Sequence, residues 1–348
     1  MGGTAARPGH AMKLKDLAHK LGMSRTTVSR ALNGHPEVSE RTRERVIAVA
    51  ASVGYRPNTM ARHLATGRAD AIGIICPPTA HDLGDPYFLE VVSGMTKAIE
   101  CTNKDLIIAS ASNVDELRTY ERMAEGRRVD GMIVTRTKLN DRRLQYLVKK
   151  GIPFVAYGRS ILPGPYSWFD FDTEAGVRQA VERLVNLGHR RIALLNGPLE
   201  LHFTTQARKG YIDAMAAAGL PVNARYMIEG TLSRASSYEA MTRILSCNPR
   251  PSAVIVDNPP CGAGAVRALV DAGVMLGSEM SIIVNGGLPP DTLMGYNFTI
   301  LQWAVPHDVG VTIVELMLAV LNGKPPEKLH VLWQPSLEIG NSDGPCID

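Results

Sequence analysis

Most sequence signatures of catalysis and metal binding are missing from this chain. It contains no Walker phosphate loop, no G-x-S-x-G and no H-E-x-x-H, and its nine histidines are scattered rather than clustered with cysteines. The stretch CGAGAVRAL at 261–269 suggests a dinucleotide loop, but it lacks the third glycine and a downstream acid at the spacing that ribose requires. We therefore expect a protein that is not an enzyme and that holds neither a cofactor nor a metal ion.

Paired cysteines and long apolar runs are also absent. The five cysteines are scattered and never form a C-x-x-C pair, so they indicate ordinary thiols of a reducing compartment. No apolar run approaches the roughly 18 residues that a membrane span needs, and residues 1–11 contain no apolar segment typical of a signal peptide. These absences favour a cytoplasmic protein without a membrane partner.

Positive charge is present, but it is concentrated near the start of the chain. Between Lys13 and Arg68 there are eleven lysines and arginines against four acidic residues, a net charge of +7, whereas residues 69–348 carry −4. A basic segment joined to a mildly acidic body favours a polyanionic partner for that segment alone, although a solvated charged face would have the same composition. The length of 348 residues allows two or three compact units.

Residues 12–56 have the pattern of three short helices. Apolar residues three and four apart indicate a helix in LKDLAHKLG that ends at Gly22, a second in RTTVSRALN capped by Ser24, and a third in ERTRERVIAVAASVG capped by Ser39. Two small helices joined by a tight turn are typical of a helix-turn-helix, whose second helix enters the major groove of DNA. A three-helix bundle that docks on a protein is the alternative.

The second of these helices carries polar side chains on the face opposite Val28 and Leu32. Arginine can hold guanine with two hydrogen bonds, and threonine offers a hydroxyl and a methyl group to base edges. Lys13 and Arg41, at helix starts, suit phosphates, which position a DNA-binding domain without specifying sequence. The candidate DNA-binding residues of the three helices are Lys13, Ser24, Arg25, Thr26, Thr27, Ser29, Arg30, Asn33, Arg41 and Tyr55.

From residue 70 onward, strand patterns alternate with helical ones. Such alternation favours parallel sheets with helices on both faces, and two such halves would form a ligand-binding cleft at the carboxyl ends of their strands. We expect strands at 71–77, 106–110, 131–135, 153–157, 191–197, 253–258, 281–286 and 331–340, and helices near 88–102, 113–126, 139–150, 174–188, 205–218, 262–272 and 306–322. The expected fold class is α/β, with a helix-turn-helix head and a two-lobed body of two doubly wound parallel sheets.

Four motifs follow one another across residues 12–69: T-V-S-R-x-L-N, V-S-x-x-T-R-x-R-V, G-Y-x-P-N-x-x-A-R-x-L and T-G-R. In this order and spacing they resemble the DNA-binding head of the lactose/galactose repressor family. The resemblance implies a head at 12–56, a hinge helix and linker at 57–69, and an effector-binding and dimerisation domain at 70–348. The N-subdomain of that domain would comprise about 70–168 and 304–331, and the C-subdomain about 169–303 and 332–348.

The segment after Y-x-P-N would be a hinge helix, which in this family folds only on the operator. At around ten residues such a helix is too short to be stable alone. The resemblance implies that Leu64 enters the minor groove as an apolar wedge that unstacks a base step and kinks the DNA. Asn58 can cap this helix, Ala61 is small enough for two hinge helices to pack closely, and Arg62 can reach phosphates or minor-groove edges.

The rest of the chain resembles the body of the same family, whose fold is like that of periplasmic sugar-binding proteins. The matching runs are DPYF at 85–88, FDTEAG at 171–176, LGHRRIALLNGP at 187–198, GAVRAL at 264–269 and ILQW at 300–303. Its members sense sugars or nucleobases, which are held by aromatic stacking and polar groups in a cleft. The implied effector-binding residues are Asp85, Tyr87, Phe88, Arg159, Asp172, Arg208, Asp257, Asn258, Asn285 and Gln302.

Several pocket positions depart from the family's pattern. Where the family reads V-D-R, this chain has Gly158 before Arg159, and where it has a sugar-binding arginine, this chain has Ala207 with Arg208 beside it. The family's A-N-D and G-F-D-D runs are altered here at 257–259 and 284–287. The loss of acids that bind hydroxyls leaves open a larger, less polar or anionic effector, an altered sugar site, or control by a protein corepressor.

The resemblance implies a bacterial transcription regulator, most often a repressor, that acts in the cytoplasm at the nucleoid. It would bind a near-palindromic double-stranded DNA operator and respond to a small, sugar-like effector. The tail LEIGNSDGPCID has no heptad repeat, so a homodimer is favoured over a tetramer. A solute-binding receptor for transport is the rival interpretation, and it would leave the basic head unexplained.

Overall fold

The computed structural model describes residues 12–33, 35–55, 67–76, 86–111, 115–288 and 295–347. The chain forms two compact units, Met1–Arg68 and Ala69–Asp348. Each unit has buried apolar clusters of its own, so each has the core that an independent domain needs.

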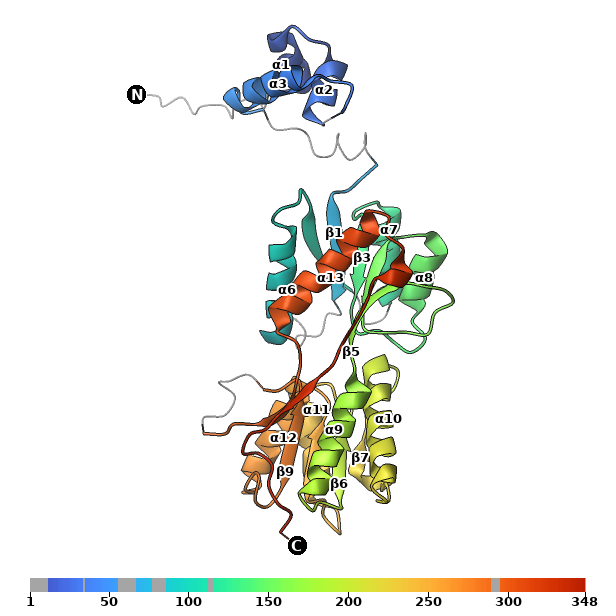
Figure 1. Ribbon diagram of the computed structural model, residues 1–348, viewed down its shortest axis with the longest axis vertical. Helices are drawn as coiled ribbons and strands as arrows, with labels where there is room; N and C mark the ends of the chain where they lie inside the picture. Colours follow the sequence, from blue (N-terminus) through green and yellow to red (C-terminus); the bar gives the residue numbers. More distant parts are fainter. Residues whose placement is uncertain are drawn as a thin grey trace, which may run out of the picture. The chain divides into compact units, whose positions relative to one another are not determined.

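The first unit contains three short helices, α1 (Leu14–Leu21), α2 (Arg25–Leu32) and α3 (Glu40–Ser52) (Figure 1). Gly22 ends α1 in the left-handed conformation with a φ of 65°, and the hydroxyls of Ser24 and Ser39 accept hydrogen bonds from first-turn N–H groups of α2 and α3. The helices turn their apolar sides inward onto a core whose fully buried members are Leu17, Val28 and Val46. The three helices and their predicted caps are confirmed.

The second unit contains two lobes, each built on a six-stranded sheet. We call the first the N-lobe; its sheet has the order β11-β5-β4-β3-β1-β2, and all its neighbouring strands are parallel. The strands are β1 (Ala71–Cys76), β2 (Asp105–Ser110), β3 (Gly131–Val134), β4 (Phe154–Tyr157), β5 (Ser167–Phe171) and β11 (His330–Trp333). Strands β1 and β3 are buried along their whole length, because helices cover both faces of the sheet.

Two pairs of helices cover the N-lobe sheet: α6 (Pro86–Ile99) with α13 (Pro306–Leu321) on one face, and α7 (Glu116–Glu125) with α8 (Arg142–Lys150) on the other (Figure 1). Although α6 and α13 are far apart in sequence, their backbones approach closely at two glycines. A Cβ added at Gly94 would overlap the carbonyl oxygen of His307, and one added at Gly310 would overlap that of Val91. The two helices can therefore pack this closely only because Gly94 and Gly310 have no side chain.

The second lobe, the C-lobe, has the sheet order β12-β10-β9-β8-β6-β7, in which only the β10–β12 pair is antiparallel. Its strands are β6 (Ile192–Leu195), β7 (Met227–Ile228), β8 (Ala253–Val256), β9 (Ser281–Asn285), β10 (Thr299–Gln302) and β12 (Ser336–Glu338). Short 3-10 helices, η1 (Ala224–Tyr226) and η2 (Pro326–Lys328), precede β7 and β11. The predicted α/β class with two mainly parallel sheets is confirmed.

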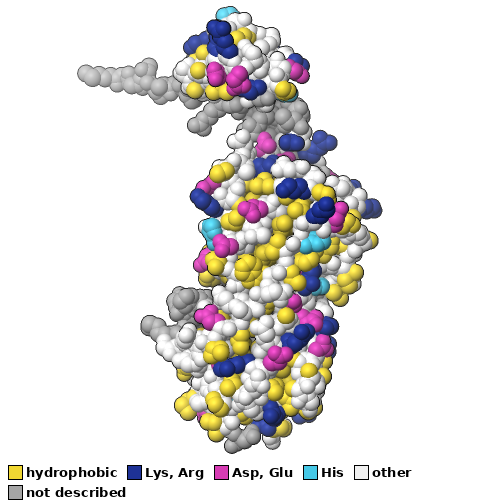
Figure 2. All heavy atoms as spheres, in the orientation of Figure 1, with side chains coloured by type: hydrophobic (Ala, Val, Ile, Leu, Met, Phe, Trp, Pro, Cys, Tyr) yellow, Lys and Arg dark blue, Asp and Glu magenta, His cyan; other side chains and the backbone are white. Residues whose placement is uncertain are grey.

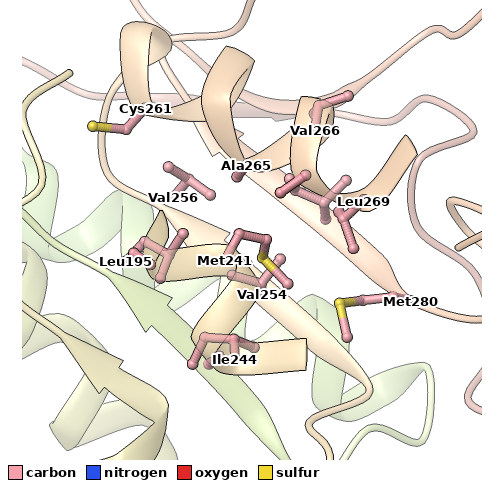
Figure 3. Close-up of a cluster of buried hydrophobic side chains, with 14 of the residues drawn as sticks. Leu195, Met241, Ile244, Val254, Val256, Cys261, Ala265, Val266, Leu269 and Met280 are labelled. Atoms are coloured by element: carbon pink, nitrogen blue, oxygen red, sulfur yellow. The ribbon is translucent and has the colours of Figure 1, made fainter. Parts of the chain in front are cut away.

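Four long helices sandwich the C-lobe sheet: α9 (Thr173–Asn186) and α10 (His202–Ala217) on one face, α11 (Arg234–Leu245) and α12 (Pro259–Asp271) on the other. The core under α11 and α12 is drawn in Figure 3, where side chains of both helices meet those of β8. Its labelled members include Met241, Ile244, Val254, Val256, Ala265 and Leu269, all of which are fully buried. The C-lobe is thus fixed mainly by apolar packing on both faces of one sheet.

Most elements lie where the alternation predicted them, but β5, β7, β10, α11 and the short 3-10 helices η1 and η2 were not predicted. The run 331–340 was expected to be one strand, and this expectation is wrong, because β11 joins the N-lobe sheet and β12 joins the C-lobe sheet. The expected subdomain limits at 168/169 and 331/332 accordingly fall inside β5 and β11. The chain crosses between the lobes three times, after β5, after β10 and after β11.

The visible surface of residues 69–348 carries lysines and arginines interspersed with acidic side chains rather than one large field of a single sign (Figure 2). Over the described part of the chain, no helix combines the length and the apolar content that crossing a bilayer requires. The same residues contain no cluster of three or more His, Cys, Asp or Glu placed to hold a metal ion.

Candidate DNA-binding head and effector cavity

Helix α2 has one buried and one polar side. Val28 and Ala31 are buried in the small core, whereas Arg25, Thr26 and Arg30 are exposed. Arg30 forms an ion pair of 3.0 Å with Glu37, but both side chains are more than half exposed, so the pair contributes little and can be exchanged for another anion. The side chains of this exposed row can donate hydrogen bonds to acceptor atoms on the major-groove edges of bases.

The other predicted contacts of the head surround this row. The Ser24 and Thr27 hydroxyls lie 2.8 Å apart within the cap of α2, and Ser29 accepts a 3.4 Å hydrogen bond from Asn33. Lys13 and Arg41 are exposed at the starts of α1 and α3, and Tyr55 packs half-buried against the core of the head. The predicted hinge contacts Asn58, Ala61, Arg62 and Leu64 lie outside the described residues.

The second unit contains a cavity of about 200 Å³ between the two lobes. Its N-lobe wall comes from α6 and from the residues that follow β3, β4 and β5, and its C-lobe wall comes from α10, the start of α12 and the end of β10. The lining residues are Cys76, Tyr87, Phe88, Val91, Thr135, Arg136, Thr137, Tyr157, Gly158, Asp170, Phe171, Thr173, Phe203, Leu232, Asn258, Pro259, Pro260 and Trp303. A cavity at the carboxyl ends of parallel strands, enclosed by two lobes, is the usual place for a small ligand in such folds.

Aromatic rings form one side of this cavity. Phe171, at the end of β5, and Trp303, directly after β10, stack with ring centroids 5.0 Å apart and planes 17° apart, and Tyr87 meets Trp303 edge-on at 5.2 Å. The Tyr87 and Tyr157 hydroxyls lie 3.4 Å apart. The indole Nε1–H of Trp303 donates to the side-chain oxygen of Asn285 at 2.8 Å, which fixes the orientation of the ring.

A buried polar group supports the C-lobe wall from behind. Asp257 is fully buried and accepts hydrogen bonds from the backbone N–H of Gly197 at 2.7 Å and from the side chain of Asn258. Burial raises the pKa of Asp257 from 3.8 to about 7, although these hydrogen bonds oppose the rise. Asn285 donates to the carbonyl oxygen of Asp257 at 3.1 Å, so Asp257 and Asn285 hold the wall in place and Asn258 alone of the three reaches the cavity.

A polar bridge between the lobes separates this cavity from a second, more open one of about 450 Å³. Arg159 of the N-lobe donates to Asp170 at 2.6 Å and to the side-chain oxygen of Gln206 of the C-lobe at 2.7 Å, and Gln206 also donates to Asp170 at 3.2 Å. His202 lies 2.7 Å from Gln206, and burial lowers the pKa of its imidazole. Arg159 and Asp172 line the second cavity rather than the first.

Backbone contacts join the lobes beside the same bridge. The N–H of Leu139 donates to the carbonyl of Glu200, and the N–H of His202 donates to the carbonyl of Thr137, each at 2.9 Å. The Lys138 ammonium lies 3.3 Å from the Glu200 carboxylate. The loop after β3 is therefore attached to the loop before α10 along one side of the cavity.

Comparison with known proteins bears on both units. Residues 69–323 match the family described as periplasmic binding proteins and sugar binding domain of the LacI family, and residues 13–58 match the bacterial regulatory proteins of the lacI family. The first match alone covers more than half of the chain. The chain belongs to the LacI family. It is a DNA-binding transcriptional regulator with a head of the helix-turn-helix type, and not an enzyme.

Relatives within the LacI family match almost the whole chain. The HTH-type transcriptional regulator RafR of Escherichia coli is 37% identical over 332 residues, which is 95% of this chain and 98% of RafR. A solved complex of the transcriptional regulator CelR with cellobiose is 26% identical and superposes with a TM-score of 0.72 over 97% of this chain and 100% of that one. The Lac repressor dimer bound to its operator and the anti-inducer ONPF is 24% identical, with a TM-score of 0.80 over 96% and 99%, and supports the fold.

The structure brings together only part of the effector set predicted from sequence. Tyr87, Phe88 and Asn258 line the cavity, and Asp257 and Asn285 lie directly behind it. Arg159 and Asp172 face the second cavity, where Asp172 caps α9. Arg208 points outward and pairs with Glu229 at 3.1 Å, Gln302 is exposed, and neither residue lines either of these two cavities. Asp85 lies outside the described residues.

Sequence reasoning missed several residues that line the cavity: Thr135, Arg136, Thr137, Phe171, Thr173, Phe203 and Trp303. Three of them follow β3 directly, and Thr173 follows the end of β5, so their place at the carboxyl ends of strands was a usable signal. Trp303 lies inside the ILQW run, next to Gln302, which is the residue that the resemblance implies.

Proposed function

We propose that this regulator acts as a homodimer on a near-palindromic operator, most simply as a repressor in the cytoplasm at the nucleoid. Each head would place α2 in the major groove, where Arg25, Thr26 and Arg30 read bases and Lys13 and Arg41 contact phosphates. A small, sugar-like effector in the cavity between the lobes would alter the affinity for the operator.

One observation carries the effector part of this proposal: the cavity takes its walls from both lobes. Phe171 is the last residue of β5, directly before the first crossing segment, and Trp303, which stacks on it, lies in the second crossing segment directly after β10. A ligand held against both rings would interact differently with different lobe arrangements, and only such a difference lets a ligand shift a conformational equilibrium. The CelR structure contains cellobiose, which supports a sugar as the class of effector.

The dimer and the hinge rest on the resemblance of this chain to its family. We propose that residues 57–69 form a hinge that orders on DNA, with Leu64 as the wedge at the centre of the operator. The solved Lac repressor is a dimer on its operator, which supports two-fold pairing here.

The DNA-binding part is tested by selecting from a random duplex pool with the purified full-length chain at low salt. We expect enrichment of an inverted repeat, and recovery of no repeat would contradict the proposal. On the selected site, Arg25→Ala should weaken binding about 10- to 100-fold. Arg267→Ala, which removes an exposed arginine paired with Asp271 on α12, is the matched control and should leave binding unchanged.

The hinge has a separate readout. Leu64→Ala should weaken operator binding and reduce the bend in the DNA, because a methyl group cannot separate a base step as a leucine side chain does. A phasing assay on gels measures the bend directly. The same bend with Leu64→Ala as with the parent chain would show that Leu64 is not the wedge.

A further inference from the structure

Three threonines in the effector cavity have hydroxyl groups that the protein does not use. Thr135, Thr137 and Thr173 are 8%, 3% and 4% exposed, and all three line the cavity. Among the residues that the structure describes, none of the three hydroxyls has a hydrogen-bond partner. Because the three residues line the cavity, these hydroxyl groups are suited to donate to and accept from a bound ligand.

The carboxylates next to the cavity are, in contrast, already occupied. Asp170 accepts from Arg159 and Gln206 on one oxygen and from the backbone N–H of Phe171 at 2.9 Å on the other. Asp257 accepts from Gly197 on one oxygen and from Asn258 on the other. Asp257 does not line the cavity, and Asp170, which does, already has three donors on its roughly four acceptor sites, so the threonine hydroxyls are the more available partners for a ligand.

Thr137 has its place because residue 158 is a glycine. Gly158 has a φ of 112°, and a Cβ at this position would overlap the Thr137 hydroxyl oxygen. Any side chain at 158 would therefore displace the hydroxyl, besides being strained in this backbone conformation. The tight contact fixes Thr137 Oγ1 relative to the end of β4.

In contrast to the polar threonine hydroxyls, another side of the cavity is apolar and is formed by aromatic rings. The stacked Phe171 and Trp303 and the edge-on Tyr87 make this side of the cavity apolar. The cavity of about 200 Å³ is smaller than the roughly 300–1,000 Å³ of sites for drug-sized ligands, so it suits a single ring or the terminal ring of a longer molecule.

We propose that the cavity selects an uncharged ring that presents hydroxyl groups to Thr135, Thr137 and Thr173 and an apolar face to Phe171 and Trp303. The ligand class is a neutral sugar or glycoside rather than a sugar acid or sugar phosphate. This inference rests on the proposed effector function and assigns the residues that decide which effector is bound.

The charge of the ligand is tested with matched probes. Glucose and galactose, each free and as a methyl glycoside, are compared with glucuronic acid, galacturonic acid and glucose 6-phosphate. Binding is measured to the full-length chain by calorimetry and by thermal shift, and operator affinity is measured with each probe present. We expect the neutral member of a pair to bind at least about 10-fold more tightly, because an added anion would meet the Asp170 carboxylate, and the Arg136 guanidinium, which also lines the cavity, already interacts with another group.

The residues are tested with variants that keep their shape. Thr135→Val, Thr137→Val and Thr173→Val each remove one hydroxyl and should weaken binding of the neutral probe about 3- to 10-fold. Thr242→Val, on the exposed face of α11, is the control and should have no effect. Gly158→Ala should weaken binding as Thr137→Val does, whereas Gly164→Ala carries a similar backbone strain, with a φ of 101°, but has open space around it and should not.

The outcomes distinguish a failure of this inference from a failure of the proposed effector function. Tighter binding of an acid or phosphate, with loss on Arg136→Gln, would overturn the neutral class and leave the effector function standing. Unchanged affinity in all three valine variants would overturn the threonine assignment in the same way. If no probe, neutral or anionic, shifts the melting temperature or the operator affinity, a sugar effector is wrong and this inference fails with it.

Discussion

Replacement of Arg143 by methionine should destabilise the N-lobe strongly, because its guanidinium group holds together a buried cluster. Arg143 is 5% exposed and donates to both oxygens of Asp141, at 2.9 and 2.6 Å, and to Glu116 at 2.6 Å. It also donates to the carbonyls of Thr135 and Arg136 at 3.1 and 2.9 Å, at the edge of the effector cavity. Asp141 itself is fully buried.

The magnitude follows from what the substitution leaves behind. Methionine keeps most of the apolar volume, but Asp141 would remain buried as a carboxylate without its counter-ion, and losing one partner of a buried pair costs about 3–5 kcal/mol. For a unit of this size that corresponds to a fall of roughly 6–15 °C in melting temperature. The double variant Arg143→Met/Asp141→Asn should recover part of the loss, because no uncompensated charge is left.

The pH dependence of this loss has a defined sign. Burial alone would raise the pKa of Asp141, but the hydrogen bonds and the charge of Arg143 outweigh it and hold the pKa below its usual value. The stabilisation is therefore fully present above the pKa of the unfolded chain and is lost as the pH falls through the lower pKa of the folded chain. The difference between parent and Arg143→Met should shrink correspondingly in acid.

Urea denaturation of the full-length chain, followed by circular dichroism at several pH values, measures this effect. The control is Arg118→Met on the neighbouring α7, which removes an arginine that is 82% exposed and pairs with Asp115 at 3.0 Å. A surface pair contributes about 0–1 kcal/mol, so Arg118→Met should change little. If Arg143→Met cost no more than Arg118→Met, the buried cluster would not be what stabilises this part of the lobe.

Two further substitutions test other parts of the structure. Burial raises the pKa of Asp257 from 3.8 to about 7, so the unfolded chain loses this proton first as the pH rises. The free energy of unfolding should therefore fall by on the order of 1–4 kcal/mol between about pH 4 and pH 7 and then level off. Urea denaturation should give a smaller pH slope for Asp257→Asn than for the parent chain, and equal slopes would exclude Asp257 as the source. Gly94→Ala should destabilise the N-lobe by about 1–3 kcal/mol or more by forcing α6 away from α13, while Ser93→Ala, on the exposed side of α6, should stay within about 0.5 kcal/mol; equal melting temperatures for the two variants would contradict the close approach.

The fold could be predicted where local pattern and tertiary position agree. The runs AIGIIC of β1 and AVIV of β8 are buried along their length, as strands covered on both faces must be. Strand β5 was missed because Trp168 and Asp170 make SWFDF look unlike a buried run. Its acid is tolerated because Arg159, Gln206 and the backbone N–H of Phe171 all donate to it, and no local pattern reveals the contacts with Arg159 and Gln206.

Helix α11 was missed for a related reason. Its sequence RASSYEAMTRIL has a weak apolar stripe, in which Ala240, Met241 and Ile244 are the buried apolar positions. The helix is held by packing on α12 and on the sheet rather than by strong intrinsic preference. Tertiary contacts supply what the segment alone does not indicate.

The effector site shows how sensitive such predictions are to register. On α10, successive residues point about 100° apart, so Gln206 reaches the bridge between the lobes while Arg208, two residues on, faces solvent and Glu229. At the end of β10, neighbouring side chains face opposite ways, so Trp303 lines the cavity while Gln302 does not. The sequence indicates the right segments, but which face of each segment lines the cavity depends on packing that the sequence does not display.

The position of the aromatic stack suggests how ligand and lobe arrangement are linked. Of the three crossing segments, the first begins directly after Phe171, the second contains Trp303, and the third contributes Gln334, which donates to Asp172 of the first at 3.1 Å. Any change in the angle between the lobes involves backbone rotation in these segments, so it would also change the distance and angle between the Phe171 and Trp303 rings. A ligand resting on both rings would resist or favour that rotation in proportion to the difference in its contacts, whereas a ligand held by one lobe alone would bind without any effect on the operator. Under the proposed function, an effector would therefore act through contacts with both lobes, and Phe171 and Trp303 rather than the buried Asp257 would link its binding to the arrangement of the lobes.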